Sequence, residues 1–310
     1  METIQNMMHE ITTTLSHYYK NQELAQQHAW WIVCSITGKS KQELLLEPSI
    51  FLDASQQARL TSWLDKITKE HMPLAYLIGI VPFLDLELCV QPPLLIPRPE
   101  TEEWVGNLCA RLKELRKKNI SILDIGTGTG CIALALAQAM PESTITAIDI
   151  NPQALALAQE NAAKNGITNV NFVRSNLFEN VAGSFDLIVS NPPYISCEEF
   201  IDVDPSVVHW EDHGALVAPD NGLALIKEII THAPTFLRSN KELVDRGISN
   251  LYIEIGYKQG KSVVDLMQQA GFTNIVIEQD LQGHDRVVKG SAVDATTEKK
   301  SARSGKHSSR

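Results

Sequence analysis

Short apolar runs alternate with segments of helical periodicity from residue 120 to about residue 277. The apolar runs have the length of buried strands, and the segments between them show the spacing typical of helices. Strands that alternate with helices form a mostly parallel sheet, so we predict a doubly wound α/β fold with its ligand at the carboxyl ends of the strands. The predicted strands are 120–123, 144–148, 170–173, 185–189, 251–255 and 274–277, and the predicted helices are 131–139, 152–165, 222–238 and 259–270.

The chain before this region has a different character. Residues 3–72 read as helical, with apolar residues recurring at i, i+3, i+4 and i+7, and they contain no cluster of catalytic side chains. Residues 76–98 place four prolines between short apolar runs, which favours strands joined by turns. We therefore predict a helical bundle at 1–74, a β-hairpin linker at 75–98, the α/β domain at 99–290 and a tail at 291–310.

The charge of the chain is uneven and restricts its partners. The 310 residues carry a formal charge of −10, but residues 291–310 hold five Lys or Arg against two acids, so the remainder carries −13. A body this acidic repels phosphate backbones, and we expect no direct binding of nucleic acid. The tail is rich in Ser, Lys and Arg and lacks large apolar residues, so we predict that it is disordered.

Other features of the sequence restrict the cellular location of the protein and the kinds of metal or redox site that it can hold. No run of 18 uncharged apolar residues occurs, and the N-terminus lacks an export signal, so we expect neither a membrane span nor secretion. The five cysteines are scattered without a C-x-x-C pair, which is typical of reduced thiols in a cytoplasmic protein. None of the nine histidines stands at metal-ligand spacing from cysteines or acids, so we expect no metal site.

A glycine-rich turn follows the first strand of the α/β region. Residues 124–130 read Asp-Ile-Gly-Thr-Gly-Thr-Gly and lead into an Ala/Leu-rich helix. The dinucleotide pattern G-x-G-x-x-G would require glycine where Cys131 stands, and the P-loop pattern would require a Gly-Lys pair. The turn contains no Lys or Arg and opens with the acid Asp124, so it favours a cationic ligand over a pyrophosphate.

A second acid, Asp149, ends the next strand, 19 residues after Gly130. A carboxylate in this place can accept hydrogen bonds from two ribose hydroxyls. The alternative is that Asp149 caps the helix opening at Pro152, but Asn151 is suited to that role. A ribose-binding acid beside a turn without basic residues indicates a ribosylated, cationic, phosphate-free cofactor, and S-adenosyl-L-methionine meets this description.

The fourth strand of the region ends in Asn191-Pro192-Pro193-Tyr194. The two prolines fix the backbone, so the Asn191 side chain and the Pro192 carbonyl are held ready with little reorganisation. Both are acceptors suited to the two N–H bonds of an NH2 group. Tyr194 offers a flat ring on which a planar amide or nucleobase can stack.

Such a turn addresses a specific chemical problem. A planar NH2 group conjugated to a carbonyl or a ring is a weak nucleophile. Two acceptors that hold it in line with a methyl group localise its lone pair and favour the positive charge that develops on nitrogen. We therefore expect a direct displacement without a covalent enzyme intermediate.

These residues together resemble one known family, the release-factor glutamine methyltransferases. The resemblance covers roughly residues 20–290. Its most specific part joins Ile-Pro-Arg-Pro-Glu-Thr-Glu at 96–102 to Asn-Pro-Pro-Tyr at 191–194, since Asn-Pro-Pro-Tyr alone also occurs in adenine and cytosine amino-methyltransferases. Further segments that carry it are Pro-Leu-Ala-Tyr-Leu-Ile-Gly at 73–79, the glycine turn, Glu-Ile-Gly at 254–256 and Gly-His-Asp-Arg-Val-Val at 283–288.

The resemblance implies a seven-stranded Rossmann-like methyltransferase domain and an N-terminal helical domain that docks the substrate protein. It implies methyl transfer from S-adenosyl-L-methionine to the side-chain nitrogen of the glutamine in the Gly-Gly-Gln motif of peptide chain release factors, in support of translation termination. The product of the cofactor is S-adenosyl-L-homocysteine. The implied catalytic and substrate-binding residues are Asn191, Pro192, Pro193 and Tyr194, and the implied cofactor-binding residues are Asp124, Gly126, Thr127, Gly128, Thr129, Gly130, Asp149, Asn176, Leu177 and Asn191.

Two positions depart from the family pattern. Asn176 stands where the family usually has an acid, and its side chain can still accept a hydrogen bond from the adenine amino group beside the apolar wall of Leu177. The segment after the turn at 191–194, here called the active turn, often reads Glu-Pro in the family, whereas here it is Glu211-Asp212. The segment 98–101 resembles a helix opening beside the cofactor, and a purely structural role for it is an open alternative.

Other functions stay open at this point. One is the same chemistry on a glutamine of a ribosomal protein or on a nucleobase amine, although the charge of −13 disfavours nucleic acid. Another is a non-catalytic adaptor, against which the complete set of acceptors at 191–194 argues. His209, Trp210 and His213, in the loop after this turn, are interpreted as packing residues.

Overall fold

The computed structural model describes residues 2–46, 49–115 and 119–292. The described chain divides into two compact units. One comprises the residues up to Ile80 together with Val203–Trp210, and the other comprises the rest. None of the helices in these ranges combines the length and the apolar character needed to cross a bilayer.

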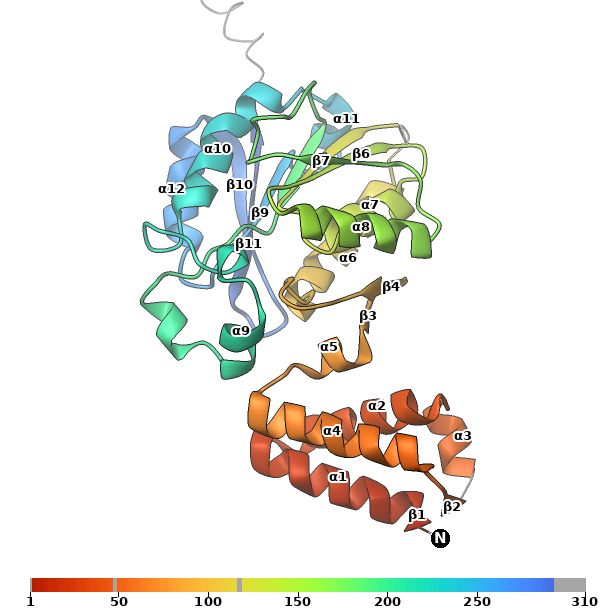
Figure 1. Cartoon of the computed structure of the whole chain (residues 1–310). Helices are drawn as coiled ribbons and strands as arrows, with labels where there is room; N and C mark the ends of the chain where they lie inside the picture. Colours follow the sequence, from red (N-terminus) through yellow and green to blue (C-terminus); the bar gives the residue numbers. More distant parts are fainter. Residues whose placement is uncertain (1, 47–48, 116–118, 293–310) are drawn as a thin grey trace, which may run out of the picture. The chain divides into compact units, whose positions relative to one another are not determined.

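The first unit is a helical bundle with a very small sheet (Figure 1). Apolar residues at helical spacing, such as Ile4, Ile11 and Leu15, form its core together with apolar residues of the other helices. Asn21 and Asp53 start two of the helices, because their side chains accept hydrogen bonds from backbone N–H groups of the first turn. Its elements are β1 (Glu2–Thr3), α1 (Ile4–Tyr19), α2 (Gln22–Thr37), α3 (Lys41–Leu46), β2 (Ser49–Ile50), α4 (Ala54–Glu70), α5 (Leu74–Ile78) and α9 (Pro205–Trp210).

The boundaries differ from the predicted ones in three places. The linker predicted at 75–98 begins with most of α5, which packs on the bundle core through Leu74 and is capped by Gly79. The hairpin itself consists of β3 (Ile80–Phe83) and β4 (Leu86–Cys89). Helix α9 joins the bundle although it follows the active turn in sequence. Residues 291 and 292 of the predicted tail belong to β11, which continues to Ala292, and residues 293–310 lie outside the described chain.

The second unit is built on a seven-stranded sheet in the order β10-β11-β9-β8-β5-β6-β7. The five strands from β9 to β7 run parallel, and β11 and β10 complete the sheet in antiparallel pairing. This confirms the predicted doubly wound fold, although β11 was not predicted. The strands are β5 (Ser121–Ile125), β6 (Thr144–Asp149), β7 (Val170–Arg174), β8 (Leu187–Ser190), β9 (Leu251–Glu254), β10 (Phe272–Gln279) and β11 (Asp285–Ala292).

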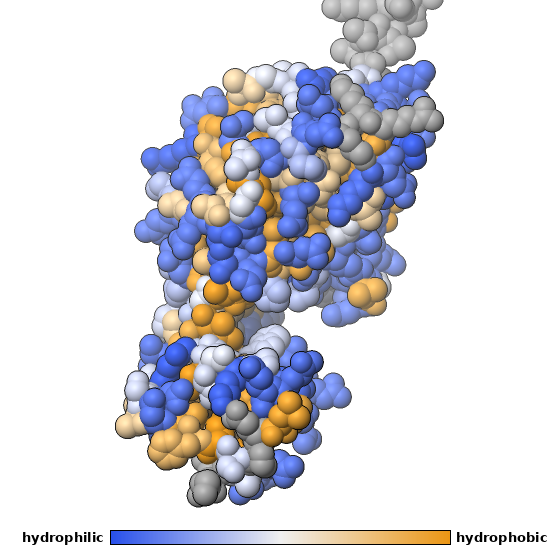
Figure 2. All heavy atoms as spheres, turned by 90° about the vertical axis from the view of Figure 1, so that its right-hand side faces the viewer, coloured by the Kyte–Doolittle hydropathy of each residue, from blue (hydrophilic) through white to orange (hydrophobic). Residues whose placement is uncertain are grey.

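Helices cover both faces of this sheet, and a hydrophobic core lies under each layer (Figure 1). Hydrophilic residues occupy much of the face of this unit that Figure 2 shows. On one face lie α6 (Pro99–Lys113), α7 (Cys131–Ala139) and α8 (Pro152–Lys164), and on the other lie α10 (Ala224–Phe236) and α12 (Gly260–Gln269). The remaining short helices are η1 (Glu199–Asp202), η2 (His213–Ala215) and α11 (Lys241–Asp245).

The backbone of the turn after β8 is supported by Gly222 and Gln259. The Tyr194 carbonyl accepts a hydrogen bond from Gln259 Nε2 at 2.9 Å. A Cβ atom added to Gly222 would lie 1.9 Å from that carbonyl oxygen, and Gly222 has a φ of 79°. Only glycine lets these two backbone segments approach so closely.

We predict that Gly222→Ala lowers the free energy of unfolding by about 1–3 kcal/mol, because a side-chain atom forced into packed space costs this much. The matched control is Gly183→Ala, which has a similar φ of 89° but nothing within 4 Å of the added Cβ. Thermal unfolding of both variants measures the difference. Equal destabilisation of the two would contradict the proposed collision.

Candidate active site

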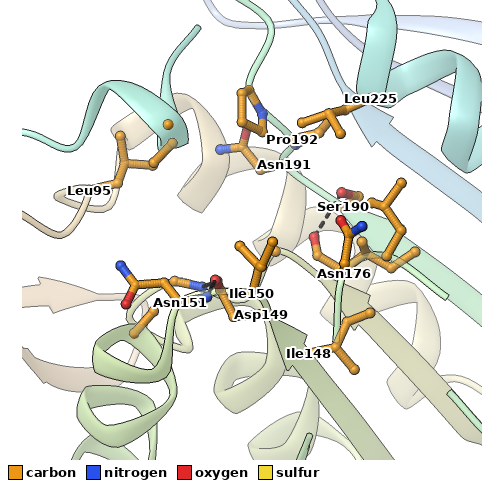
Figure 3. Close-up of a pocket in the computed structure, with 18 of the residues that line it drawn as sticks. Leu95, Ile148, Asp149, Ile150, Asn151, Asn176, Ser190, Asn191, Pro192 and Leu225 are labelled. Carbon is orange, nitrogen blue, oxygen red and sulfur yellow. Dashed lines mark hydrogen bonds between the residues drawn. The ribbon is translucent and has the colours of Figure 1, made fainter. Parts of the chain in front are cut away.

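A pocket of ≈ 210 Å³ lies at the carboxyl ends of β5, β6 and β8. The parallel topology was expected to place a ligand at this edge. Figure 3 shows Asn191 and Pro192 on one side of the pocket and Asp149, Ile150 and Asn151 on the opposite side. The predicted site residues that line it are Gly126, Gly128, Asp149, Asn176, Leu177, Asn191, Pro192 and Pro193.

The lining of the pocket favours a cation. Asp149 and Asp212 are the charged residues among the described lining residues, and neither Lys nor Arg is among them. An anionic phosphate would therefore lose its hydration without gaining a positive partner. In the described part of the chain, no group of three or more His, Cys, Asp and Glu side chains is arranged to hold a metal ion.

The backbone of the glycine turn gives independent support for this conclusion. The N–H groups of Gly126 and Thr127 both donate to the Ile148 carbonyl at 2.9 Å. The N–H of Gly128 donates to Asp149 Oδ2 at 2.8 Å. Phosphate-binding turns direct such N–H groups at the ligand. Here they hold β5 and β6 together instead.

Asp149 ends β6 with its carboxylate anchored by the backbone. Its Oδ1 accepts a hydrogen bond from the Asn151 N–H at 2.9 Å, and its Oδ2 accepts one from Gly128. Two further lone pairs are available for a ligand. Burial raises the pKa of Asp149, and its backbone donors oppose this rise. Helix α8 is capped by Asn151, whose side chain accepts from the Gln153 N–H, so Asp149 is not needed as the cap.

Asp124 holds the glycine turn against α7. It is fully buried, and its Oδ2 accepts hydrogen bonds from Thr127 Oγ1 at 2.7 Å and from the Ala133 N–H at 3.2 Å. Its Oδ1 has no hydrogen-bond partner among the described residues. Burial raises the pKa of Asp124 to about 7, although its two hydrogen bonds oppose this rise.

Five predicted site residues do not line the pocket. Two of them are Asp124 and Thr127, which bond to each other, and a third is Gly130, where an added Cβ would lie 3.1 Å from Ala158. Tyr194 is partly buried and packs against the core that α10 and α12 cover. The set is Asp124, Thr127, Thr129, Gly130 and Tyr194, and their direct contact with cofactor or substrate stays a prediction.

Asn191 and Pro192 place two free acceptors on the pocket wall. Asn191 Nδ2 donates to Thr101 Oγ1 at 3.2 Å. No described residue donates to Asn191 Oδ1 or to the Pro192 carbonyl oxygen. Ser190 anchors the end of β8, because its hydroxyl donates to the Ile125 carbonyl at 2.8 Å. The binding of an NH2 group by these two acceptors stays a prediction.

The segment before α6 has a structural contact of its own. Arg98 Nη2 lies 2.6 Å from Glu211 Oε2, and the Glu211 side chain is fully buried. Burial raises the pKa of Glu211, while the guanidinium of Arg98 opposes this rise. The neighbouring Asp212 N–H donates to the Pro93 carbonyl. These contacts fix the segment of the pocket wall that contains Asp212.

Sequence reasoning missed part of the pocket. Ile150 is 60% exposed although it is apolar, and it lines the pocket directly after Asp149. The signal in the sequence that could have identified it is an apolar residue directly after an acid that ends a strand. Leu95 and Asp212 also line the pocket, but they come from distant segments that no spacing rule connects to the strands.

Comparisons with known proteins agree with this geometry. Residues 7–79 match the family model of the PrmC N-terminal domain, and residues 108–208 match the model of the methyltransferase small domain. A release factor glutamine methyltransferase of Lactococcus lactis is 41% identical over 234 residues, which are 75% of this chain and 82% of that protein. The chain belongs to the release factor glutamine methyltransferase family.

Two further relatives carry the same name. The release factor glutamine methyltransferase of Vibrio cholerae is 40% identical over 265 residues, which are 84% of this chain and 87% of that protein. That of Flavobacterium psychrophilum is 35% identical over 293 residues, which are 92% of this chain and 98% of that protein. The family resemblance read from the motifs is thereby confirmed.

The buried carboxyl of Asp124 gives this family member a pH-dependent stability. Its folded-state pKa of about 7 exceeds the ordinary 3.8, so the folded chain keeps a proton that the unfolded chain releases between these values. The contribution of Asp124 to stability therefore falls as pH rises from about 4 to about 7, by up to about 1.4 kcal/mol per pH unit.

We predict that Asp124→Asn removes this dependence. The melting temperature of the variant minus that of the unmodified protein should be larger at pH 8 than at pH 5. The reason is that Asp124 loses its proton in this range, whereas Asn does not titrate. Calorimetric melting of both proteins at the two pH values measures the effect. A difference in melting temperature that is the same at pH 5 and pH 8 would contradict the expectation.

Proposed function

We propose that this chain transfers a methyl group from S-adenosyl-L-methionine to the side-chain amide nitrogen of the glutamine in the Gly-Gly-Gln motif of peptide chain release factors. The observation that carries the proposal is the pair of free acceptors, Asn191 Oδ1 and the Pro192 carbonyl, on the wall of an acidic pocket. An NH2 group is the substrate that uses both acceptors.

The pocket residues fit the cofactor. When bound, S-adenosyl-L-methionine supplies an electrophilic methyl group on a positively charged sulfur. Asp149 would accept hydrogen bonds from the ribose hydroxyls, and Ile150 and Leu177 would provide the apolar walls for the adenine. Asn176 Nδ2 donates to Glu179 Oε1 at 2.9 Å, which leaves Asn176 Oδ1 to accept from the adenine amino group. The acidic lining suits the cation.

The substrate side follows from the two acceptors. Asn191 Oδ1 and the Pro192 carbonyl would each accept one N–H of the glutamine amide and hold its nitrogen in line with the methyl carbon. The bound cofactor would supply the methyl group and its sulfur would take the electrons of the carbon–sulfur bond, so the positive charge would pass to the glutamine nitrogen as the N–C bond forms. Both acceptors stabilise this charge, and the nitrogen then loses a proton to solvent. The pathway needs neither a strong base nor a covalent enzyme intermediate.

The helical unit has a separate role in the proposal. None of its described residues is among the residues that line the pocket, and it matches the PrmC N-terminal domain over residues 7–79. We assign to it the docking of the release factor. We also place the reaction in the cytoplasm, where release factors act, and the five cysteines, all unpaired, suit that compartment.

Methyl transfer to a purified class I release factor tests the function directly. We expect labelled methyl from S-adenosyl-L-methionine on the Gly-Gly-Gln glutamine, located by peptide mass. No label should enter a release factor in which that glutamine is replaced by alanine. Labelling of both release factors, or of a ribosomal protein alone, would contradict the proposal.

Asn191→Ala tests the mechanism. The variant should lose transfer to below detection, because the amide nitrogen loses an acceptor that positions it. Its affinity for the cofactor should stay within about tenfold, since one neutral hydrogen bond contributes about 0.5–1.5 kcal/mol.

The control for this variant is Asn180→Ala, which removes an exposed asparagine outside the pocket lining. Turnover and calorimetric cofactor binding are measured for both variants. Undiminished turnover in Asn191→Ala would remove the proposed mechanism.

A further inference from the structure

A buried carboxylate lies behind the active turn. Glu254 ends β9, and its side chain is 1% exposed. Its Oε2 accepts hydrogen bonds from Thr101 Oγ1 at 2.7 Å and from Trp104 Nε1 at 2.8 Å, both on α6. Thr101 is also buried, and its hydroxyl is the atom to which Asn191 donates.

The donors and acceptors fix the direction of this chain of hydrogen bonds. The indole of Trp104 can only donate, so the atom facing it must be an oxygen that accepts. As a carboxylate, Glu254 accepts from Thr101 as well, which uses the single hydroxyl proton of Thr101. The Thr101 oxygen can then only accept, and the group of Asn191 that faces it must be the NH2. A flipped Asn191 would bring two acceptors together.

We infer that Thr101 and Glu254 are positioning residues, which lock the Asn191 amide so that its Oδ1 faces the pocket and its NH2 faces away. The inference rests on the proposed function, in which Asn191 Oδ1 accepts from the substrate amide. Each hydrogen bond of the chain polarises the next, so donation to Thr101 also makes Oδ1 a better acceptor. The fold builds this lock from two segments about 150 residues apart, on α6 and β9.

A purely structural role for the cluster makes a different expectation. Replacement of Trp104 and replacement of Thr101 would then lower kcat and the melting temperature equally, since each residue donates one hydrogen bond to the same buried carboxylate. In the positioning role only Thr101 connects to Asn191. Trp104→Phe is therefore the matched control, because it removes a donor to Glu254 and leaves the Thr101–Asn191 contact in place.

The first experiment compares Thr101→Val, Thr101→Ser and Trp104→Phe in the full-length enzyme with a release factor substrate. Thr101→Val should lower kcat by about 10- to 100-fold, the size of effect expected when a reacting group is misplaced. The KM for the release factor and the Kd for the cofactor should change by less than about threefold. Thr101→Ser restores the hydroxyl and should recover most of kcat, and Trp104→Phe should lower kcat by less than about threefold.

Two results would overturn the inference. One is a kcat of Thr101→Val within twofold of the unmodified enzyme. The other is a loss of kcat in Trp104→Phe as large as that in Thr101→Val, with melting temperatures lowered in parallel. The first would show that the orientation of Asn191 does not depend on Thr101, and the second would show that the cluster acts on stability alone.

The second experiment needs no activity and no variant that must fold. In the unmodified enzyme, nuclear magnetic resonance of the Asn191 side-chain NH2 should show one proton that a hydrogen bond protects from exchange with solvent. Rapid solvent exchange of both protons would overturn the inference. A failure of the enzyme to transfer methyl groups to release factors would refute the proposed function. The magnetic resonance measurement would still decide the orientation of the Asn191 side chain in that case.

Discussion

Strand β5 pairs with β6 on one side and with β8 on the other, and Ile125 lies opposite both Ile148 and Ser190. This register makes the three strands end at the same level of the sheet. The glycine turn after β5, Asp149 at the end of β6 and Asn191 after β8 therefore lie side by side at the edge of the sheet. The pocket exists because parallel pairing brings these three loop segments to one edge.

Charge decides what this edge can bind. The N–H groups of the glycine turn are used to join β5 to β6, and the charged side chains that line the pocket within the described chain are acids. The same fold binds dinucleotides where such N–H groups point outward at a phosphate. In the proposed function, the turn and the acids together bind a cation with a ribose. The acceptors of the next loop would then bind the NH2 group that receives the methyl.

The sequence predicted what depends on local patterns. Six of the seven strands of the large sheet, all except β11, were predicted from periodicity, and the glycine turn, Asp149 and the turn at 191–194 were singled out from short motifs. What it missed depends on contacts between distant segments. The role of Glu254 was not identified because its partner Thr101 is 153 positions away, and α9 could not be assigned to the helical unit because it follows the active turn in sequence. The contact of Tyr194 with a core assembled from several helices was not predicted either.

The central claim is that Asn191 Oδ1 and the Pro192 carbonyl together bind the glutamine amide. The most direct measurement is a crystal structure of the enzyme with S-adenosyl-L-homocysteine and a peptide containing Gly-Gly-Gln. The account predicts the glutamine nitrogen at about 2.7–3.2 Å from both oxygens, with the sulfur of the cofactor product on the side of Asp149. A glutamine amide bound elsewhere, or an Asn191 side chain with its NH2 toward the substrate, would contradict it.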